Sequence, residues 1–280
     1  MKILLAVILS INTVLLFAQE KPARLIVRGD DMGYSHSGNL ALMECYKNGI
    51  QTSIEVIVPS PWFPEAVKML QQDTGIDVGV HLALTSEWDN MIWRPLTNAP
   101  TLRDADGYFL PMMFPNKNYP GRSVAEAKPS IREIEMEFRA QIEMARKYIP
   151  RISHISGHMG CTNLNNEVKA VIAKLTREYN LINENELKQV SYIGFGEQLK
   201  TSEEKIERFL VLLDKLEKGK TYLFVEHPGL DNDELKAIHH IGYENVAADR
   251  QGVTDMFTSK KVKAKIKEKN IQLIGYRDLR

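Results

Sequence analysis

The sequence predicts an α/β fold, a distorted TIM-like (β/α) barrel in a single domain. Short β-branched runs alternate with longer amphipathic stretches, and this alternation favours parallel strands covered by helices. Six or more such units in one domain favour a closed or partly closed barrel over an open sheet. The fractions of 44% hydrophobic and 26% charged residues are ordinary for a globular chain with a sizeable core.

The first element expected in the chain is a leader. Residues 1–18, MKILLAVILSINTVLLFA, are mostly apolar, carry one lysine and end in a small residue, which is typical of a secretory signal peptide. We therefore expect the barrel domain over residues 19–280 and a periplasmic or secreted location, without stable membrane insertion after cleavage. A retained membrane anchor is the alternative, although the apolar stretch is short for a spanning helix.

The strand candidates are short runs rich in β-branched and aromatic residues. The first of them is almost wholly apolar, as expected of a strand that is buried in the sheet. In order, the strand candidates are residues 24–28, 53–58, 77–84, 152–156, 221–227 and 271–276.

Helix candidates lie between these strands. Their apolar residues recur every three or four positions, and Ser or Asn stands at several of the starts as an N-cap candidate. We find no internal repeat and no low-complexity tract. In order, the helix candidates are residues 37–49, 64–72, 130–149, 166–180, 202–219 and 258–270.

One long segment, Thr85 to about Pro129, departs from the alternation. It is rich in Pro, Asn, Gly and aromatic residues and lacks a helical period. A segment of this length inside a compact domain is usually a functional lid or a binding loop. A mobile surface excursion is the alternative, but solvated segments seldom carry Trp and Phe at this density.

Charge and cysteine content exclude several classes of function. The formal net charge is zero, so the chain has no electrostatic footprint for a nucleic-acid partner. The two cysteines, Cys45 and Cys161, are too few for a disulfide scaffold and lack the paired spacing of a structural zinc site. Ligands of any bound metal are therefore not thiolates. The two cysteines form either a bridge or a pair of buried free thiols.

Ionisable residues stand at the ends of several predicted strands. In a barrel of parallel strands, catalytic groups collect at the carboxyl ends. Each residue alone has a structural explanation, as a helix cap, a core histidine or a turn residue. Together they are expected to meet on one face and to partner one another or a cation. They are Asp30 and Asp31, His81, His154 and His158, and Glu226 and His227.

One Asp with two His residues is a common ligand set for a catalytic divalent metal. We expect Asp31, His81 and His158 to be the metal ligands. Asp30, next to Asp31 on a backbone that turns at Gly29 and Gly33, is then the candidate general base. A cation stabilises two neighbouring carboxylates that would otherwise repel each other, so that they can take separate roles.

Four short motifs give the chain a family resemblance. At GDDMG (29–33), GVHLAL (79–84), HISGHMG (154–160) and VEHPG (225–229), the chain resembles the YdjC-like carbohydrate deacetylases, also called the chitooligosaccharide deacetylase family. The similarity spans nearly all of the chain after the leader, including its closing stretch over residues 249–279.

The resemblance implies a distorted βα barrel that hydrolyses an N-acetyl group on a sugar. It implies a divalent metal at Asp31, His81 and His158, with Asp30 as the base and His227 as the group that protonates the leaving amine. The third motif departs from the family pattern, since Ser156 and Gly160 flank His158 where members often carry an Asp and a second His. His154 is the alternative ligand if this motif is shifted.

The mechanism expected for this site is attack of metal-activated water on the acetyl carbonyl. The cofactor is one divalent ion, with Zn and Mg as the first choices, and the substrate is an acetylated oligosaccharide such as an N-acetylglucosamine oligomer. Trp88, Trp93 and Arg94 from the long segment are candidate substrate contacts, because aromatic faces pack on sugar rings and Arg binds hydroxyls. The alternative role for the tryptophans is to seal the barrel mouth.

Three other functions remain open at this level. The same metal site would serve an O-acetyl esterase or another amidase. A secreted glycan-binding protein without activity would use the aromatic segment alone. Glycoside hydrolysis by Glu226 with Asp30 is also conceivable, but it leaves the histidines unexplained.

Overall fold

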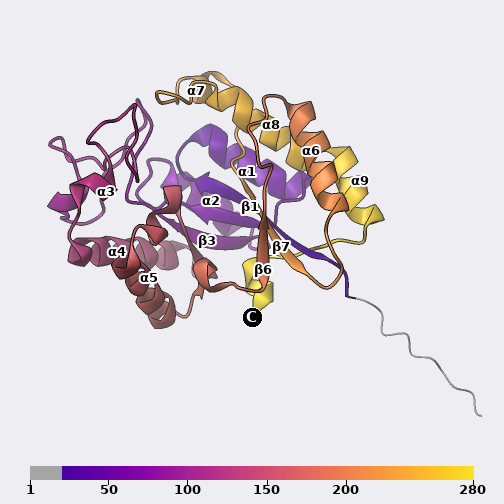
Figure 1. Ribbon diagram of the computed structural model, residues 1–280, viewed down its shortest axis with the longest axis horizontal. Coiled ribbons are helices and arrows are strands. Elements are labelled where there is room, and N and C mark those ends of the chain that lie inside the picture. Colours follow the sequence, from indigo (N-terminus) through magenta and orange to yellow (C-terminus); the bar gives the residue numbers. More distant parts are fainter. Residues whose placement is uncertain (1–20) are drawn as a thin grey trace, which may run out of the picture.

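A parallel sheet that curls into a half-barrel forms the centre of the protein (Figure 1). The computed structural model describes residues 21–280, so the predicted signal peptide lies outside the described residues. The strands pair in the order β5-β4-β3-β2-β1-β7-β6, and β8 pairs with β1. Their bounds are β1 Arg24–Met32, β2 Ser53–Val56, β3 Asp77–Leu82, β4 His154–Gly157, β5 Ile182–Asn183, β6 Val190–Ile193, β7 Thr221–Glu226 and β8 Gln272–Leu273.

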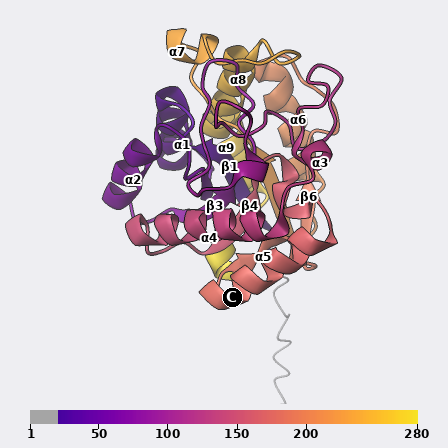
Figure 2. The ribbon, with the colours of Figure 1, turned by 90° about the vertical axis from the view of Figure 1, so that its left-hand side faces the viewer.

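Helices surround this sheet. Figures 1 and 2 show α4 and α5 together on one side, with α6, α8 and α9 grouped on another. No helix within residues 21–280 has both the length and the apolar character needed to cross a membrane. The bounds are α1 His36–Asn48, α2 Phe63–Gln72, α3 Val124–Ala127, α4 Ile131–Tyr148, α5 Asn166–Tyr179, α6 Ser202–Asp214, α7 Asp233–Lys236, α8 Val246–Thr258 and α9 Lys260–Glu268.

Strand β1 lies at the centre of the sheet, between β2 and β7. Its residues Leu25, Ile26 and Val27 are fully buried, which is the pattern of a parallel strand covered on both faces. The pairings of β1 with β2 and β7, and of β3 with β2 and β4, are all parallel. The carboxyl ends of these strands therefore lie at one edge of the half-barrel.

The prediction of a distorted TIM-like barrel in one domain is confirmed. The sheet ends at β5 and β6, which are not paired with each other among the described strands, so the barrel is open on that side. Helix starts follow the predicted capping chemistry. Ser35 accepts from the Gly38 amide at α1, and Asn165 accepts from the Val168 amide at α5.

Several elements differ from the prediction. The two-residue strand β5, the half-exposed strand β6 and the helix α8 were not predicted. Helix α8 lacks a clean apolar stripe because polar residues, including Arg250 and Thr254, are among its buried positions. The predicted last strand is only Gln272–Leu273 and is followed by a 3-10 turn, η4, Tyr276–Leu279.

The long segment after β3 packs against the body of the protein. Trp88, Trp93 and Phe109 within it are buried. Buried Glu137 of α4 accepts from the amides of Leu96 and Thr97 at 3.1 and 3.0 Å. Hydrogen bonds from a side chain of α4 therefore hold the segment in place. Elsewhere, Cys45 and Cys161 are both buried and free.

Candidate active site

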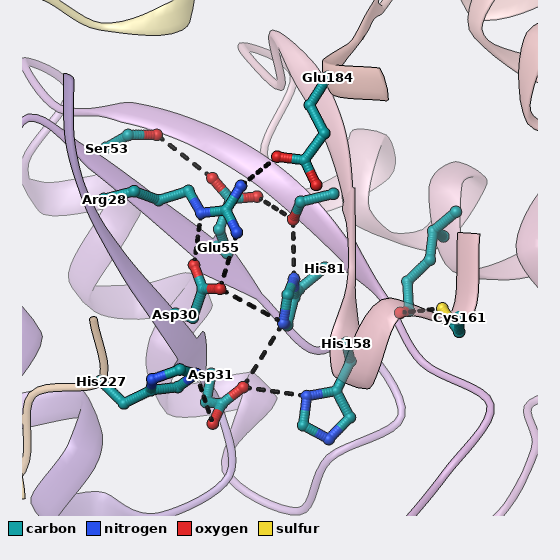
Figure 3. A network of polar contacts seen from close by, with 12 residues as sticks. Arg28, Asp30, Asp31, Ser53, Glu55, His81, His158, Cys161, Glu184 and His227 are labelled. Atoms are coloured by element: carbon teal, nitrogen blue, oxygen red, sulfur yellow. Dashed lines mark hydrogen bonds and ion pairs between the residues drawn. The ribbon is translucent and has the colours of Figure 1, made fainter. Parts of the chain in front are cut away.

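Three side chains from three strand ends form a buried cluster. Asp31 Oδ1 lies 3.1 Å from His158 Nδ1 and 3.6 Å from His81 Nε2. One ligand atom from each residue lies within 4.8 Å of the others. Figure 3 shows the three side chains pointing toward one another. The structure thus brings together the three residues expected to bind a metal, while their ligand role stays a prediction.

Strand β1 contains an irregularity that explains how adjacent carboxylates share one site. Successive side chains of a regular strand point to opposite faces. The pairing of β1 with β2 shifts register between Gly29 and Met32, and Asp31 has a φ of 72° in the left-handed region. Such a bulge redirects a side chain and is common beside functional sites. Asp30 and Asp31 can therefore both border the same cleft.

In each imidazole of the cluster, the ring nitrogen that does not face Asp31 has a polar partner of its own. His81 Nδ1 lies 2.7 Å from Ser156 Oγ, and Ser156 donates to Glu55 Oε2 at 2.6 Å. His158 Nε2 lies 2.9 Å from Glu87 Oε2. Burial lowers the pKa of His158, but the neighbouring carboxylates, Glu87 foremost, outweigh it and raise that pKa to about 10. Partners of this kind orient metal-binding imidazoles in known metal sites.

Arg28 fixes the side chain of Asp30. Its Nε lies 2.7 Å from Asp30 Oδ1, and its Nη2 donates to Asp30 Oδ2 at 2.9 Å. Arg28 also contacts Glu184 and donates to the Tyr276 hydroxyl at 3.0 Å. Asp30 Oδ2 lies 3.7 Å from His81 Nε2, so this carboxylate borders the cluster. Burial raises the pKa of Asp30 to about 6, although Arg28 acts in the opposite direction.

A second arginine holds Asp31. Arg250 Nη2 donates to Asp31 Oδ2 at 2.9 Å, and the guanidinium carbon lies 4.6 Å from the centre of the Tyr34 ring and 5.2 Å from that of Trp88. Burial raises the pKa of Asp31, but His158 and Arg250 outweigh it and hold that pKa well below its usual value. Asp31 is therefore an ionised carboxylate.

His227 lies at the edge of the cluster, directly after β7. Its Nε2 is 3.9 Å from Asp31 Oδ2, and its side chain is 40% exposed. Desolvation within the cleft lowers the pKa of His227 below its usual value, although Asp31 acts in the opposite direction. The side chain thus lies near the cluster with access to solvent.

The cluster opens into a cleft of about 390 Å³. Of the candidate substrate contacts, Trp88 lines this cleft, whereas Trp93 and Arg94 do not. Trp93 is buried, with its ring centre 6.4 Å from that of His158, and Arg94 stacks on the Tyr108 ring. Besides Asp30, Asp31, His81, His158 and His227, the lining includes Glu87, Trp88, Met159, His240, Tyr243 and Arg250.

The alternative ligand, His154, does not join the cluster. Its Nε2 lies 2.5 Å from Glu55 Oε1, and its ring stacks on Tyr276 with centres 3.7 Å apart. It belongs to a buried network beneath the site. The predicted alignment of the third motif, with His158 and not His154 facing Asp31, agrees with this geometry.

Four supporting residues were not predicted from the sequence. Arg28 and Glu55 could have been noticed, because each is a charged residue next to apolar residues of a buried strand and so must have a buried partner. Glu87 and Arg250 carried no such signal. Glu87 lies in the irregular long segment, and Arg250 is separated from its partner Asp31 by 219 positions.

The donor set fits a divalent cation. Asp31 Oδ1 makes no hydrogen bond within the described part of the chain and is directed between two imidazole nitrogens. One carboxylate with two imidazoles suits zinc and also accepts harder divalent ions. The half-barrel and this cluster at its carboxyl edge define an α/β-barrel protein with a candidate metal centre.

The chain belongs to the family of YdjC-like proteins, whose pattern matches residues 24–268. This confirms the resemblance seen in the four motifs. A carbohydrate deacetylase of Clostridium beijerinckii is 30% identical over 267 residues, which cover 91% of this chain and 100% of the relative. A carbohydrate deacetylase of Enterococcus faecalis is 28% identical over 272 residues, covering 91% and 98%.

A solved structure shares the fold. The crystal structure of an Enterococcus faecalis V583 protein superimposes with a TM-score of 0.72 at 24% sequence identity, and the match covers 93% of this chain and 99% of that chain. The likeness extends over the whole half-barrel and supports the fold assignment.

Proposed function

We propose that this protein is a metal-dependent carbohydrate deacetylase that removes N-acetyl groups from oligosaccharides such as N-acetylglucosamine oligomers. The observation that carries the proposal is the convergence of Asp31, His81 and His158 with Asp30 beside them. Membership of the YdjC-like family, with relatives named carbohydrate deacetylases, supports the reaction and the substrate class.

The proposed ligands of one divalent ion are Asp31, His81 and His158. When bound there, the ion supplies Lewis acidity, which makes water more acidic and a carbonyl carbon more electrophilic. Arg250 holds the second oxygen of Asp31 at 2.9 Å and leaves Oδ1 directed toward the imidazoles. Zinc and magnesium are the first candidates for the ion.

Asp30 is the proposed general base. It accepts the proton of the attacking water, and its position 3.7 Å from His81 Nε2 places it beside the proposed ion site without making it part of the cluster. The paired contacts from Arg28 fix the plane of the carboxylate. Two adjacent aspartates thereby take separate roles, because different arginines hold them.

His227 is the proposed proton donor to the leaving amine. An amine is a poor leaving group unless it is protonated, and an imidazole suits this transfer near neutral pH. His227 lines the cleft and is partly exposed, so its ring can approach a bound substrate. Glu226, the carboxylate that glycoside hydrolysis would need, is not among the residues lining the cleft.

Trp88 and Tyr243 are the proposed surfaces for the sugar. Both line the cleft, and their ring centres lie 6.2 Å apart. Aromatic faces pack well on the apolar faces of sugar rings. Trp93 and Arg94 are assigned no direct role in this arrangement.

Three variants test the division of roles. Asp30→Asn keeps the size of the side chain but removes the base, so turnover falls by about 10²–10⁴-fold while metal content is unchanged. His81→Ala and His158→Ala lose the metal itself. Elemental analysis and a deacetylation assay on short N-acetylated oligosaccharides measure both effects. Equal loss of metal in all three variants would remove Asp30 from the base role.

Product analysis separates this proposal from its alternatives. A deacetylase releases acetate and a free sugar amine from N-acetylglucosamine oligomers. Acetate release only from O-acetylated glycans would make the protein an esterase. Binding of the oligomer without product, in protein loaded with metal, would make it a glycan-binding protein.

Export of the protein is part of the proposal. Residues 1–18 have the composition of a signal peptide, and they lie outside the described residues. We expect mass spectrometry of the protein from its native cells to find the mature chain without this segment, in the periplasm or the medium. An intact leader on protein from the cytosolic fraction would contradict export.

A further inference from the structure

A chain of buried side chains runs from β2 to the metal-facing histidine of β3. Glu55 Oε2 accepts from Ser156 Oγ at 2.6 Å, and Ser156 Oγ lies 2.7 Å from His81 Nδ1. Glu55 and Ser156 are fully buried, and His81 is nearly so. Figure 3 shows Glu55 on the side of His81 that faces away from Asp31. Bulk water therefore cannot reach these side chains and compete for their hydrogen bonds.

The direction of these hydrogen bonds follows from Glu55. Its Oε1 faces His154 Nε2 at 2.5 Å and the Ser53 hydroxyl at 3.3 Å, so donors surround the carboxylate. Burial raises the pKa of Glu55, but His154 and Arg28 outweigh it and lower that pKa to about 2. An ionised carboxylate only accepts hydrogen bonds. The hydroxyl proton of Ser156 must therefore point to Glu55.

The proton position on His81 follows from Ser156. A hydroxyl has one proton, and in Ser156 it is already used toward Glu55. The serine oxygen can then only accept from His81, which places a hydrogen on Nδ1. In the neutral imidazole this leaves the lone pair on Nε2, the atom that faces Asp31 Oδ1 at 3.6 Å.

We propose that Glu55 and Ser156 are positioning residues that hold His81 as its Nδ1–H tautomer and so present the Nε2 lone pair to the cation. The inference rests on the proposed metal site. It also gives a role to Ser156, which lies two residues before His158 in the third motif. His158 differs from His81, because its Nε2 contacts the carboxylate of Glu87 directly, with no serine between them.

Two variants break the chain at different points. Ser156→Ala removes the acceptor for His81 Nδ1–H. Glu55→Gln keeps the shape of the side chain but can reverse the direction of the hydrogen bonds. When the oxygen of the new glutamine accepts from His154, its NH₂ group donates to Ser156. The Ser156 hydroxyl then donates to His81 Nδ1. The proton of His81 would move to Nε2. Ser53→Ala is the matched control, since it removes a buried hydroxyl from the other oxygen of Glu55.

Two readouts decide the proposal. The first is long-range ¹H–¹⁵N NMR of the metal-free protein, which reports the His81 tautomer directly. The second is the dissociation constant of Zn²⁺ from titration calorimetry. We expect Nδ1–H in the wild type and in Ser53→Ala, and loss of this preference in Ser156→Ala. In Glu55→Gln we expect the Nε2–H form. Zinc affinity falls by about 10–100-fold in both variants of the chain and stays unchanged in the control.

The outcomes separate the two proposals. A wild-type protein that binds no Zn²⁺ and is not activated by any divalent ion overturns the metal site, while the tautomer measurement still decides the inference. An Nε2–H tautomer in the wild type overturns the inference. Zinc affinity in Ser156→Ala and Glu55→Gln equal to that of Ser53→Ala overturns it as well, whatever the activity.

Discussion

At the level of single residues, Asp30 and Asp31 are neighbours in sequence with different partners. Arg28 holds Asp30 through two nitrogens, and Arg250 holds Asp31 through one. The pair itself was evident from its place after an apolar strand. The bulge at Asp31 and the contact with Arg250 were not evident, because they depend on packing between distant parts of the chain.

Arg28→Lys tests whether the two-nitrogen contact of the guanidinium is needed to orient the Asp30 carboxylate. A lysine keeps the charge but cannot contact both carboxylate oxygens in one plane. We expect kcat to fall by about tenfold, equivalent to roughly 1.4 kcal/mol, with little change in KM because Arg28 does not line the cleft. Steady-state kinetics measure both constants.

The control for this variant is Arg24→Lys. Arg24 is on the same strand and donates to Thr221 Oγ1 at 3.0 Å, away from the cluster. Its kinetics should match the wild type. An equal fall of kcat in both variants would trace the effect to the strand as a whole.

At the level of elements, the role of the long segment after β3 could be predicted from the sequence, but its packing could not. Its length and aromatic content predicted a functional role, and Trp88 does line the cleft. Its anchoring could not be predicted, since Glu137 and Gln141 lie in α4 and read as ordinary polar positions of a helix. In the structure both are fully buried, and Gln141 pairs with the backbone of Ala83.

Glu137→Gln tests the anchoring of the segment. The amide keeps the size of the side chain but loses the charge that accepts from Leu96, Thr97 and Gln141. Hydrogen bonds to charged groups contribute about 1.5–3 kcal/mol, so we expect lower stability on urea unfolding and faster amide exchange at residues 96–97.

Glu133→Gln is the matched control on the same helix. Glu133 also accepts from the segment, at Thr101, but this contact is exposed. We expect a change within about 0.5 kcal/mol. Equal exchange rates at residues 96–97 in Glu137→Gln and the wild type would show that the segment does not depend on the buried carboxylate.

At the level of the whole molecule, the alternation of strands and helices was sufficient to predict the barrel and the edge that carries the site. The opening between β5 and β6 was not predictable, because these strands are two and four residues long and neither is an apolar run. The last turn, η4, packs against the sheet, where Tyr276 is fully buried against His154 and Arg28. Of this turn, only Tyr276 falls within the predicted last strand, residues 271–276.

The buried pair of Glu55 and His154 makes stability depend on pH. The pKa of Glu55 is lowered from 4.5 to about 2, so its contribution is complete above 4.5 and is lost as the pH falls toward 2. The groups facing it are His154, Arg28 and, through Ser156, His81. The raised pKa of His154 acts in the opposite sense, and its contribution is lost as the pH rises beyond that pKa.

Glu55→Gln tests this dependence through the free energy of unfolding. The variant should be less stable than the wild type at neutral pH, and the difference should shrink as the pH falls below 4.5. Urea unfolding at several pH values measures it. A difference that stays constant down to the lowest pH at which the protein folds would contradict an ionised Glu55.

Removal of the metal should also act on the whole molecule. A ligand that binds only the folded state stabilises it according to its concentration and affinity. We therefore expect chelation to abolish activity and to lower the melting temperature, and a divalent ion to restore both. Full activity in excess chelator would count against the metal site.

The most direct test of the central claim is anomalous diffraction from crystals of the protein loaded with Zn²⁺. The account predicts a single strong peak that marks a zinc ion at about 2.0–2.2 Å from each of Asp31 Oδ1, His81 Nε2 and His158 Nδ1. A zinc ion bound elsewhere, or these three side chains facing no peak in protein that binds zinc in solution, would contradict it.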